Sequence, residues 1–222
     1  MTATLTEPRF APTATPTRDP GRPRSHRARN SFAVLVVAGL LAVLGAVMSS
    51  NANFSRNYVT DQLSQERINF KPVAALTDAE RQSPCVVANA GKALTTGKQA
   101  ECFANDYLGL HVRQIGGGQT YAELGVVQMD LQAKVAAAQA SGDPALADLQ
   151  KRLAALSAQR ELVFKAEMLR GTLLTSFGFS SLGEKAAQAA TVAYGGAGVM
   201  AIASLVGFAS AATRRRRTSA WG

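Results

Sequence analysis

Histidine is scarce in this chain, and its scarcity narrows the chemistry that the protein can perform. There are two histidines in 222 residues. His26 belongs to an arginine-rich N-terminal stretch, and His111 lies inside a predicted helix, where histidine is most often a surface or hydrogen-bonded side chain. Zinc and iron sites use several histidine, cysteine or carboxylate ligands at close spacing, and the sequence has no such group. We expect no metal site and no cofactor.

The sequence also lacks the short motifs of common enzymes. The glycines at 116–118 neither follow a predicted strand nor precede the Lys-Ser/Thr pair of a phosphate-binding loop. No Gly-x-Ser-x-Gly or His-Glu-x-x-His motif occurs. The carboxylates in the predicted helices are typical of solvated helix faces: Asp106, Glu123, Glu161 and Glu167. We therefore expect a protein that is not an enzyme.

Charge is absent from two long segments near the ends of the chain. Residues 32–48 and residues 186–213 contain no Asp, Glu, Lys or Arg. With its flanking serines the first becomes a segment at residues 31–50, about 30 Å of helix, which matches the hydrocarbon core of a bilayer. The second segment is predicted at residues 189–213 and is rich in Gly, Ala and Ser. Two transmembrane helices are predicted, and their lack of ionisable residues argues against an ion path through them.

The chain has a net charge of +9. Most of the excess basic residues lie just outside the two charge-free segments and not on one predicted folded surface. Basic residues next to membrane segments stay in the cytoplasm, which predicts cytoplasmic termini and residues 51–188 outside the cytoplasm. Binding of nucleic acid would need the positive charge on a folded surface with stacking aromatics, so we expect no nucleic-acid partner. The topology signals are Arg22, Arg24, Arg27, Arg29, Arg214, Arg215, Arg216 and Arg217.

Residues 1–30 form a basic arm with few apolar residues, and we expect it to be disordered. Its arginines serve as a topology signal in our interpretation, and contact with anionic lipid is the alternative. A basic stretch before an apolar run also describes a secretory signal peptide, here with a cleavage site after Ala52. We favour an uncleaved anchor, because the apolar run is longer than that of most signal peptides.

Small residues recur at four-residue spacing in both segments, and this spacing lets helix backbones approach closely in lipid. We expect the two segments of the chain to pack together, with a membrane-protein partner or a homo-oligomer as the alternative. The helix-packing residues are Ala38, Ala42, Ala46, Ala203, Gly207 and Ala211.

Between the segments the periodicity predicts an all-α domain, built as a helical hairpin or bundle with a short coiled coil. The first membrane helix continues outward until Lys71-Pro72 ends it. Residues 77–80 start a helix, residues 98–114 form another that Gly116 stops, and residues 120–140 and 144–174 form the hairpin. Residues 175–181 break the last helix before the second segment.

Four aromatic residues lie near the expected membrane surface, where such rings are favoured: Phe54, Tyr58, Phe177 and Phe179. The second pair falls in the predicted break. It acts either as an interfacial hinge or as a loop whose rings plug the base of the domain.

Both cysteines, Cys85 and Cys102, fall in the stretch predicted to be outside the cytoplasm. An even pair in an oxidising compartment is usually bridged, and a bridge of this loop length contributes about 3 kcal/mol. A metal or redox pair would favour Cys-x-x-Cys spacing or histidine neighbours. We predict a structural disulfide.

Residues 57–63 (NYVTDQL), residues 116–124 (GGGQTYAEL) and residues 164–171 (FKAEMLRG) with 177–179 (FGF) are distinctive strings. Together they resemble a family of uncharacterised actinobacterial two-pass membrane proteins, over residues 30–212. The resemblance implies the same topology. Members sometimes carry the label aromatic ring-opening dioxygenase, which the missing iron ligands do not support here.

These features predict a non-catalytic protein of the cell membrane whose outer helical domain binds another protein or an envelope component. An accessory or sensory subunit of a membrane complex is the alternative, and an envelope enzyme is the least favoured class.

Overall fold

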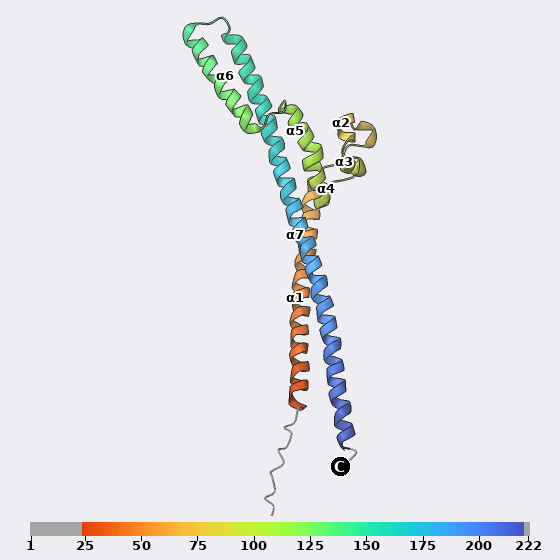
Figure 1. Cartoon of the computed structure of the whole chain (residues 1–222). Coiled ribbons are helices and arrows are strands. Elements are labelled where there is room, and N and C mark those ends of the chain that lie inside the picture. Colours follow the sequence, from red (N-terminus) through yellow and green to blue (C-terminus); the bar gives the residue numbers. More distant parts are fainter. Residues whose placement is uncertain (1–23, 220–222) are drawn as a thin grey trace, which may run out of the picture. The chain divides into compact units, whose positions relative to one another are not determined.

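The computed structural model describes residues 24–219, and this part of the chain is helical almost throughout (Figure 1). It contains no strand, only an isolated bridge between Asn69 and Ala93. The predicted all-α class is confirmed. Several predicted topology and packing residues lie outside the described residues: Arg22 altogether, and the side chains of Arg24, Arg27, Ala211, Arg214, Arg215, Arg216 and Arg217.

The first helix, α1 (Arg24–Gln65), is unbroken and contains the predicted membrane segment at residues 31–50. It also includes residues 24–30, which we expected to belong to the disordered arm. The predicted continuation of this helix beyond residue 50 is confirmed as far as Gln65.

The predicted end of this helix at Lys71-Pro72 is wrong. Arg67 adopts a positive φ of 52°, which takes the chain out of the helix two residues after Gln65. The following backbone pairs with a later loop instead, and the N–H of Leu94 donates to the carbonyl of Ile68 at 2.9 Å. Long-range backbone pairing therefore ends α1 earlier than the proline would.

A set of short elements follows and packs around a small apolar core. Thr77 and Thr96 both form capping boxes, in which a hydroxyl and a side chain three residues later satisfy free backbone N–H groups. The helix start at residues 77–80 and the helix around residues 98–114 are confirmed, although the latter contains a π-helical turn. The elements are η1 (Val73–Ala75), α2 (Asp78–Arg81), α3 (Pro84–Asn89), α4 (Gly97–Cys102), η2 (Phe103–Leu108) and α5 (Gly109–Ile115).

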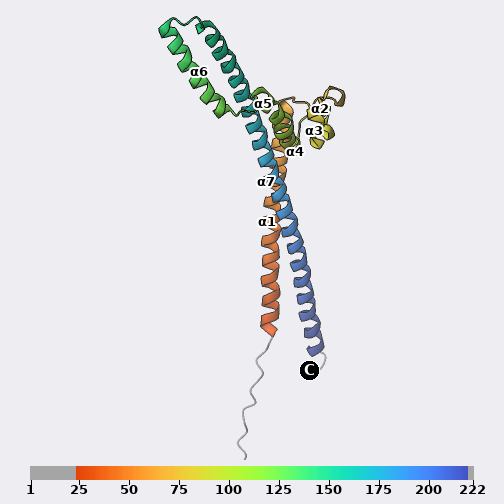
Figure 2. The same ribbon diagram turned by 45° about the horizontal axis from the view of Figure 1, so that its top comes forward.

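The hairpin consists of α6 (Tyr121–Ser141) and the first part of α7 (Leu146–Ser219), which lie side by side in both views (Figure 2). Gly142 makes the turn possible because its φ of 66° suits a residue without a side chain. A buried contact between α6 and α7 is formed by Leu124 and Val163, both almost inaccessible. The predicted helical hairpin is confirmed.

The predicted break at residues 175–181 is wrong, since α7 continues without interruption to Ser219. The hydroxyls of Thr175 and Ser176 donate to backbone carbonyls four residues earlier, so both polar side chains are satisfied within the helix. A single Gly178 costs only about 1 kcal/mol in a helix. Packing on both sides of this stretch outweighs that cost.

The chain divides into two compact units, one of residues 1–40 with 196–222 and one of residues 41–195. Both contain parts of α1 and α7. In the first unit Gly207 lies against Ser31, and Ser204 is buried. In the second unit Gly45 lies against Tyr194 and Gly183 against Ser55.

By length and composition, two of the described helices qualify to cross a membrane, over residues 29–65 and residues 146–210. Within their most apolar windows only 11% and 17% of the residues are buried inside the chain. A core helix of a soluble protein would bury most of such a window. The apolar surface of both helices is thus left for another environment.

Candidate functional site

Three of the four predicted interfacial aromatic residues form one exposed cluster, which we call the ring cluster: Phe54, Tyr58 and Phe179. The rings of Phe54 and Tyr58 stack with centroids 5.8 Å apart, and Phe179 meets Tyr58 edge-on at 6.3 Å. Their exposed fractions are 69%, 46% and 50%. The cluster joins α1 to α7. Phe179 belongs to the stretch predicted as a break, and the structure shows this stretch as part of α7.

The fourth residue, Phe177, lies apart from the ring cluster and beneath a cation. The Nζ of Lys98 is 4.8 Å from the centre of its ring. Lys98 is in the first turn of α4, and the neighbouring Gly97 lies so close to Ser180 that a side chain there would overlap it. Both interpretations of the aromatic pair, hinge and plugging loop, assumed a break and are therefore wrong.

The ring cluster is supported by close packing of α1 on α7. The hydroxyl of Ser55 donates to the carbonyl of Phe179 at 2.6 Å. A Cβ added at Gly183 would be 2.8 Å from the same hydroxyl oxygen, and one added at Gly45 would be 2.9 Å from the ring of Tyr194. These glycines allow the two backbones to approach.

The predicted helix-packing residues differ in how far they are buried within the chain. Ala38 is buried and Ala42 and Gly207 are half-buried, whereas Ala46 and Ala203 are exposed. The buried positions include a seven-residue series on each helix, with other buried residues such as Ala193 between its members: Ala38, Gly45 and Ala52 on α1, and Gly183, Ala190, Ala197 and Ser204 on α7. A seven-residue repeat keeps one face of a helix toward a wrapping neighbour, while four-residue rows drift around it.

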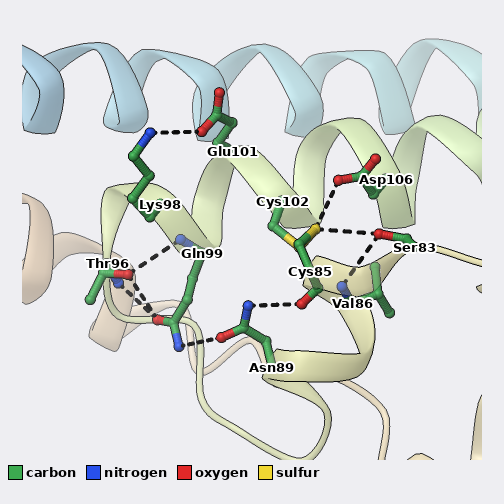
Figure 3. The surroundings of a disulfide bond; sticks show 10 residues. All are labelled: Ser83, Cys85, Val86, Asn89, Thr96, Lys98, Gln99, Glu101, Cys102 and Asp106. Carbon is green, nitrogen blue, oxygen red and sulfur yellow. Dashed lines mark hydrogen bonds and ion pairs between the residues drawn. A yellow bond between two sulfur atoms is a disulfide. The ribbon is translucent and has the colours of Figure 1, made fainter. Parts of the chain in front are cut away.

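Cys85 and Cys102 form the predicted disulfide, which joins α3 to α4 (Figure 3). Asp106 Oδ2 lies 2.8 Å from Cys85 Sγ, and Ser83 Oγ lies 3.4 Å from it. A disulfide sulfur carries no hydrogen and cannot donate to Asp106. The hydroxyl of Ser83 can donate to Cys85 Sγ. Asp106 and the two sulfurs are close enough to suggest a metal group, but bonded sulfurs offer no thiolate ligand.

Next to the disulfide, the π-helical turn η2 is held from α7. The Nε of Arg170 donates to the carbonyl of Ala104 at 2.9 Å, and the same carbonyl accepts the N–H of Gly109. Arg170 is in turn fixed by Glu167, with both carboxylate oxygens 2.9 Å from its Nη1. The disulfide-bridged elements are thus tied to the long helix.

Glu80 is the one buried carboxylate among the described residues, and it anchors these short elements. Its Oε1 contacts Lys71 Nζ at 2.8 Å and His111 Nε2 at 3.2 Å, and its Oε2 accepts the N–H of Thr77 at 2.7 Å. Burial alone would raise the pKa of Glu80, but the hydrogen bonds from Lys71 and Thr77 outweigh it and lower the pKa to about 2. The hydrogen bond to Glu80 raises the pKa of Lys71 against the opposing effect of desolvation.

Sequence reasoning missed this buried network, although part of it was visible. Thr77 and Glu80 have the spacing of a capping box, which placed Glu80 at a helix start but gave no sign of burial. His111, interpreted as a surface or hydrogen-bonded histidine, is 30% exposed, and its Nε2 lies 3.2 Å from Glu80 Oε1. It packs edge-on against Tyr107 at 4.6 Å. The network supports the packing of the short elements around Glu80.

The three sequence strings that carry the family resemblance meet on α7. Tyr58 from the first string touches Phe179, and Tyr121 from the second touches Phe164, with ring centres 5.5 Å apart. Arg160 lies over the Tyr121 ring at 4.2 Å and donates to Gln128 Oε1 at 2.7 Å. These strings are therefore contact residues between α7 and its neighbours.

No protein family, no curated protein and no solved structure matches the chain. The resemblance to the actinobacterial family stays a prediction, and the argument for function rests on the residues themselves.

Proposed function

We propose that the chain is a non-catalytic protein of the cell membrane that crosses the bilayer twice. Both termini are cytoplasmic in this proposal, and residues 51–188 form an outer helical domain that binds another protein or an envelope component. The proposed role of the protein involves no metal, cofactor or nucleic acid.

One observation carries the proposal: on both apolar helices, the first charged residues after the charge-free lengths lie next to the same contact between the helices. Gly183 lies against Ser55, and the residues next to this contact are the first charges beyond the charge-free lengths: Arg56 on α1, and Glu184 with Lys185 on α7. Two neighbouring helices that become polar at one level are what a bilayer surface requires. Their small buried fraction favours lipid over a protein core.

The direction of insertion is supported by charge and by the disulfide. Arginines flank both outer ends of the apolar lengths, which favours cytoplasmic termini. A disulfide between Cys85 and Cys102 persists in an oxidising compartment, and both residues belong to the proposed outer domain.

An uncleaved first segment fits the packing around the possible cleavage site. Ala52 is 2% exposed in the middle of α1, and its carbonyl lies 3.5 Å from a Cβ placed at Gly183. Removal of residues 1–52 would leave the small-residue face of α7 without its partner. We therefore propose that α1 is retained as an anchor.

The hairpin offers a surface for a protein partner. Phe164 and Met168 are 46% and 54% exposed and share one helix face, being four residues apart. Tyr121 of α6 extends this surface through its contact with Phe164. We call these three residues the hairpin patch.

Crosslinking in native membranes followed by purification in mild detergent tests the proposed role. We expect one partner at fixed stoichiometry, lost in Met168→Lys and retained in the control Gln132→Lys, which also changes an exposed hairpin residue. Equal recovery from both variants would rule out the hairpin patch as the binding surface.

The alternative, an accessory or sensory subunit, is favoured by the continuity of α7. A single helix connects the hairpin to the arginine tail and would transmit a displacement along its length. Deletion of residues 214–222 with insertion intact should then alter the complex. Unchanged behaviour of that variant would count against the sensory role.

A further inference from the structure

On both long helices of the second unit a stretch with exposed polar side chains begins at one level, and on α7 large exposed apolar side chains return only at Leu169. On α1 the last large exposed apolar side chain is Tyr58, because the exposed positions after it are polar, from Asp61 to Gln65. On α7 the ring cluster residue Phe179 and Leu182, which is 65% exposed, are followed outward by exposed Gly178, Thr175 and Thr172. The change from apolar to polar surface is therefore shared by the two helices.

The surface at this level is mixed in composition. On α1, Asn53, Arg56 and Asn57 are exposed around the rings of Phe54 and Tyr58. On α7, Glu184, Lys185 and Gln188 are exposed below Phe179. Aromatic rings among polar groups are favoured where acyl chains meet lipid headgroups. A continuous apolar surface would instead be expected deeper in the bilayer, as it is over residues 31–48.

The start of α4 reaches the same level from the side. Gly97 packs against Ser180, one residue from Phe179. Lys98 crosses the Phe177 ring with its side chain 64% exposed and forms an ion pair with Glu101 at 3.3 Å. An exposed lysine whose ammonium group lies over an aromatic ring is suited to the headgroup region, where aromatic rings and charged groups meet.

From these observations we propose that the ring cluster is a lipid-binding surface at the outer headgroup boundary, and that the start of α4 lies at the same boundary. The lipid surface is the chosen occupant because Phe54 follows the charge-free length of α1, where the exposed side chains from Phe32 to Val47 are apolar. This inference rests on the proposal that the chain crosses the bilayer twice. It adds the depth at which the ring cluster lies in the bilayer. The outer domain is held at the bilayer by Phe54, Tyr58 and Phe179 together.

Depth-dependent quenching of tryptophan by brominated lipids tests this placement in the full chain, reconstituted in phosphatidylcholine vesicles. The chain has one tryptophan, Trp221, which Trp221→Phe removes. Single tryptophans are then placed by Phe54→Trp and Phe179→Trp. Two controls bracket them: Leu44→Trp in the predicted membrane segment, and Val126→Trp on the exposed face of α6.

We expect bromines near the headgroup end of the acyl chain to quench Phe54→Trp and Phe179→Trp most strongly. Bromines near the chain end should quench Leu44→Trp most strongly, and no lipid should quench Val126→Trp. Absence of quenching at positions 54 and 179, with Leu44→Trp quenched, would overturn the lipid surface and leave two crossings standing. Absence of quenching at position 44 as well would overturn the crossing itself.

Discussion

Replacement of Glu80 by glutamine should loosen the short helices without changing the shape of the side chain. The folded state holds the carboxylate with a pKa of about 2 against an ordinary value of 4.5. This difference corresponds to about 3 kcal/mol of stability at neutral pH. Glu80→Gln removes that charge while its amide oxygen still accepts the N–H of Thr77.

The pH dependence follows from the direction of the shift. Because the pKa of Glu80 is lowered by folding, its contribution is complete above pH 4.5 and is lost as the pH falls from 4.5 through 2. At pH 3 the contribution falls to about half of its neutral value. The native chain and Glu80→Gln should therefore converge in acid.

Native-state hydrogen exchange of α2 and α3, followed by mass spectrometry, measures this effect locally. At pH 7 we expect exchange in Glu80→Gln to be faster by about 100-fold, as a loss of about 3 kcal/mol implies. The control Glu161→Gln removes a carboxylate that is 63% exposed and should leave α2 and α3 unchanged. Equal exchange in the native chain and Glu80→Gln at pH 7, or a difference that persists at pH 3, would refute the reasoning.

Two further predictions concern the covalent and packing supports. Replacing Cys85 and Cys102 together by alanine should lower the stability of the short-helix region by about 3 kcal/mol, measured as faster exchange in α3 and α4; unchanged exchange would contradict it. Gly183→Leu should separate α1 from α7, because even a Cβ there would be 2.8 Å from Ser55 Oγ. A crosslink between cysteines at positions 45 and 194, which are in contact in the native chain, should then be lost. The control Gly178→Ala meets open space and should keep the crosslink; its loss in both variants would contradict the proposed close approach.

Local sequence signals predicted elements well where capping and turn residues dominate. The capping residues Thr77 and Thr120 marked the starts of α2 and α6, and Gly116 marked the end of α5. The disulfide followed from the placement of an even pair. The helix ends depend on residues close in sequence. The disulfide prediction depends on the compartment inferred for the two cysteines.

Features that depend on packing between distant segments were not predictable. The stretch at residues 175–181 has the composition of a loop, but Ser55 and Gly97 pack against it and α7 continues. Four-residue spacing of small residues suggested Ala46 and Ala203, which are exposed within the chain, whereas close contacts between α1 and α7 in the second unit involve Gly45 and Gly183. Burial of Glu80 depends on Lys71 and His111, which come together only after folding.

Labelling of single cysteines with a membrane-impermeant maleimide in intact cells tests the two-crossing proposal most directly. The reporters are Thr4→Cys, Gln132→Cys and Ser219→Cys, each in a chain with Cys85 and Cys102 replaced by alanine. The account predicts that Gln132→Cys is labelled from outside, while the two terminal reporters are labelled only after the membrane is permeabilised. Labelling of either terminal reporter in intact cells, or a mature chain that begins at Asn53 by mass, would contradict it.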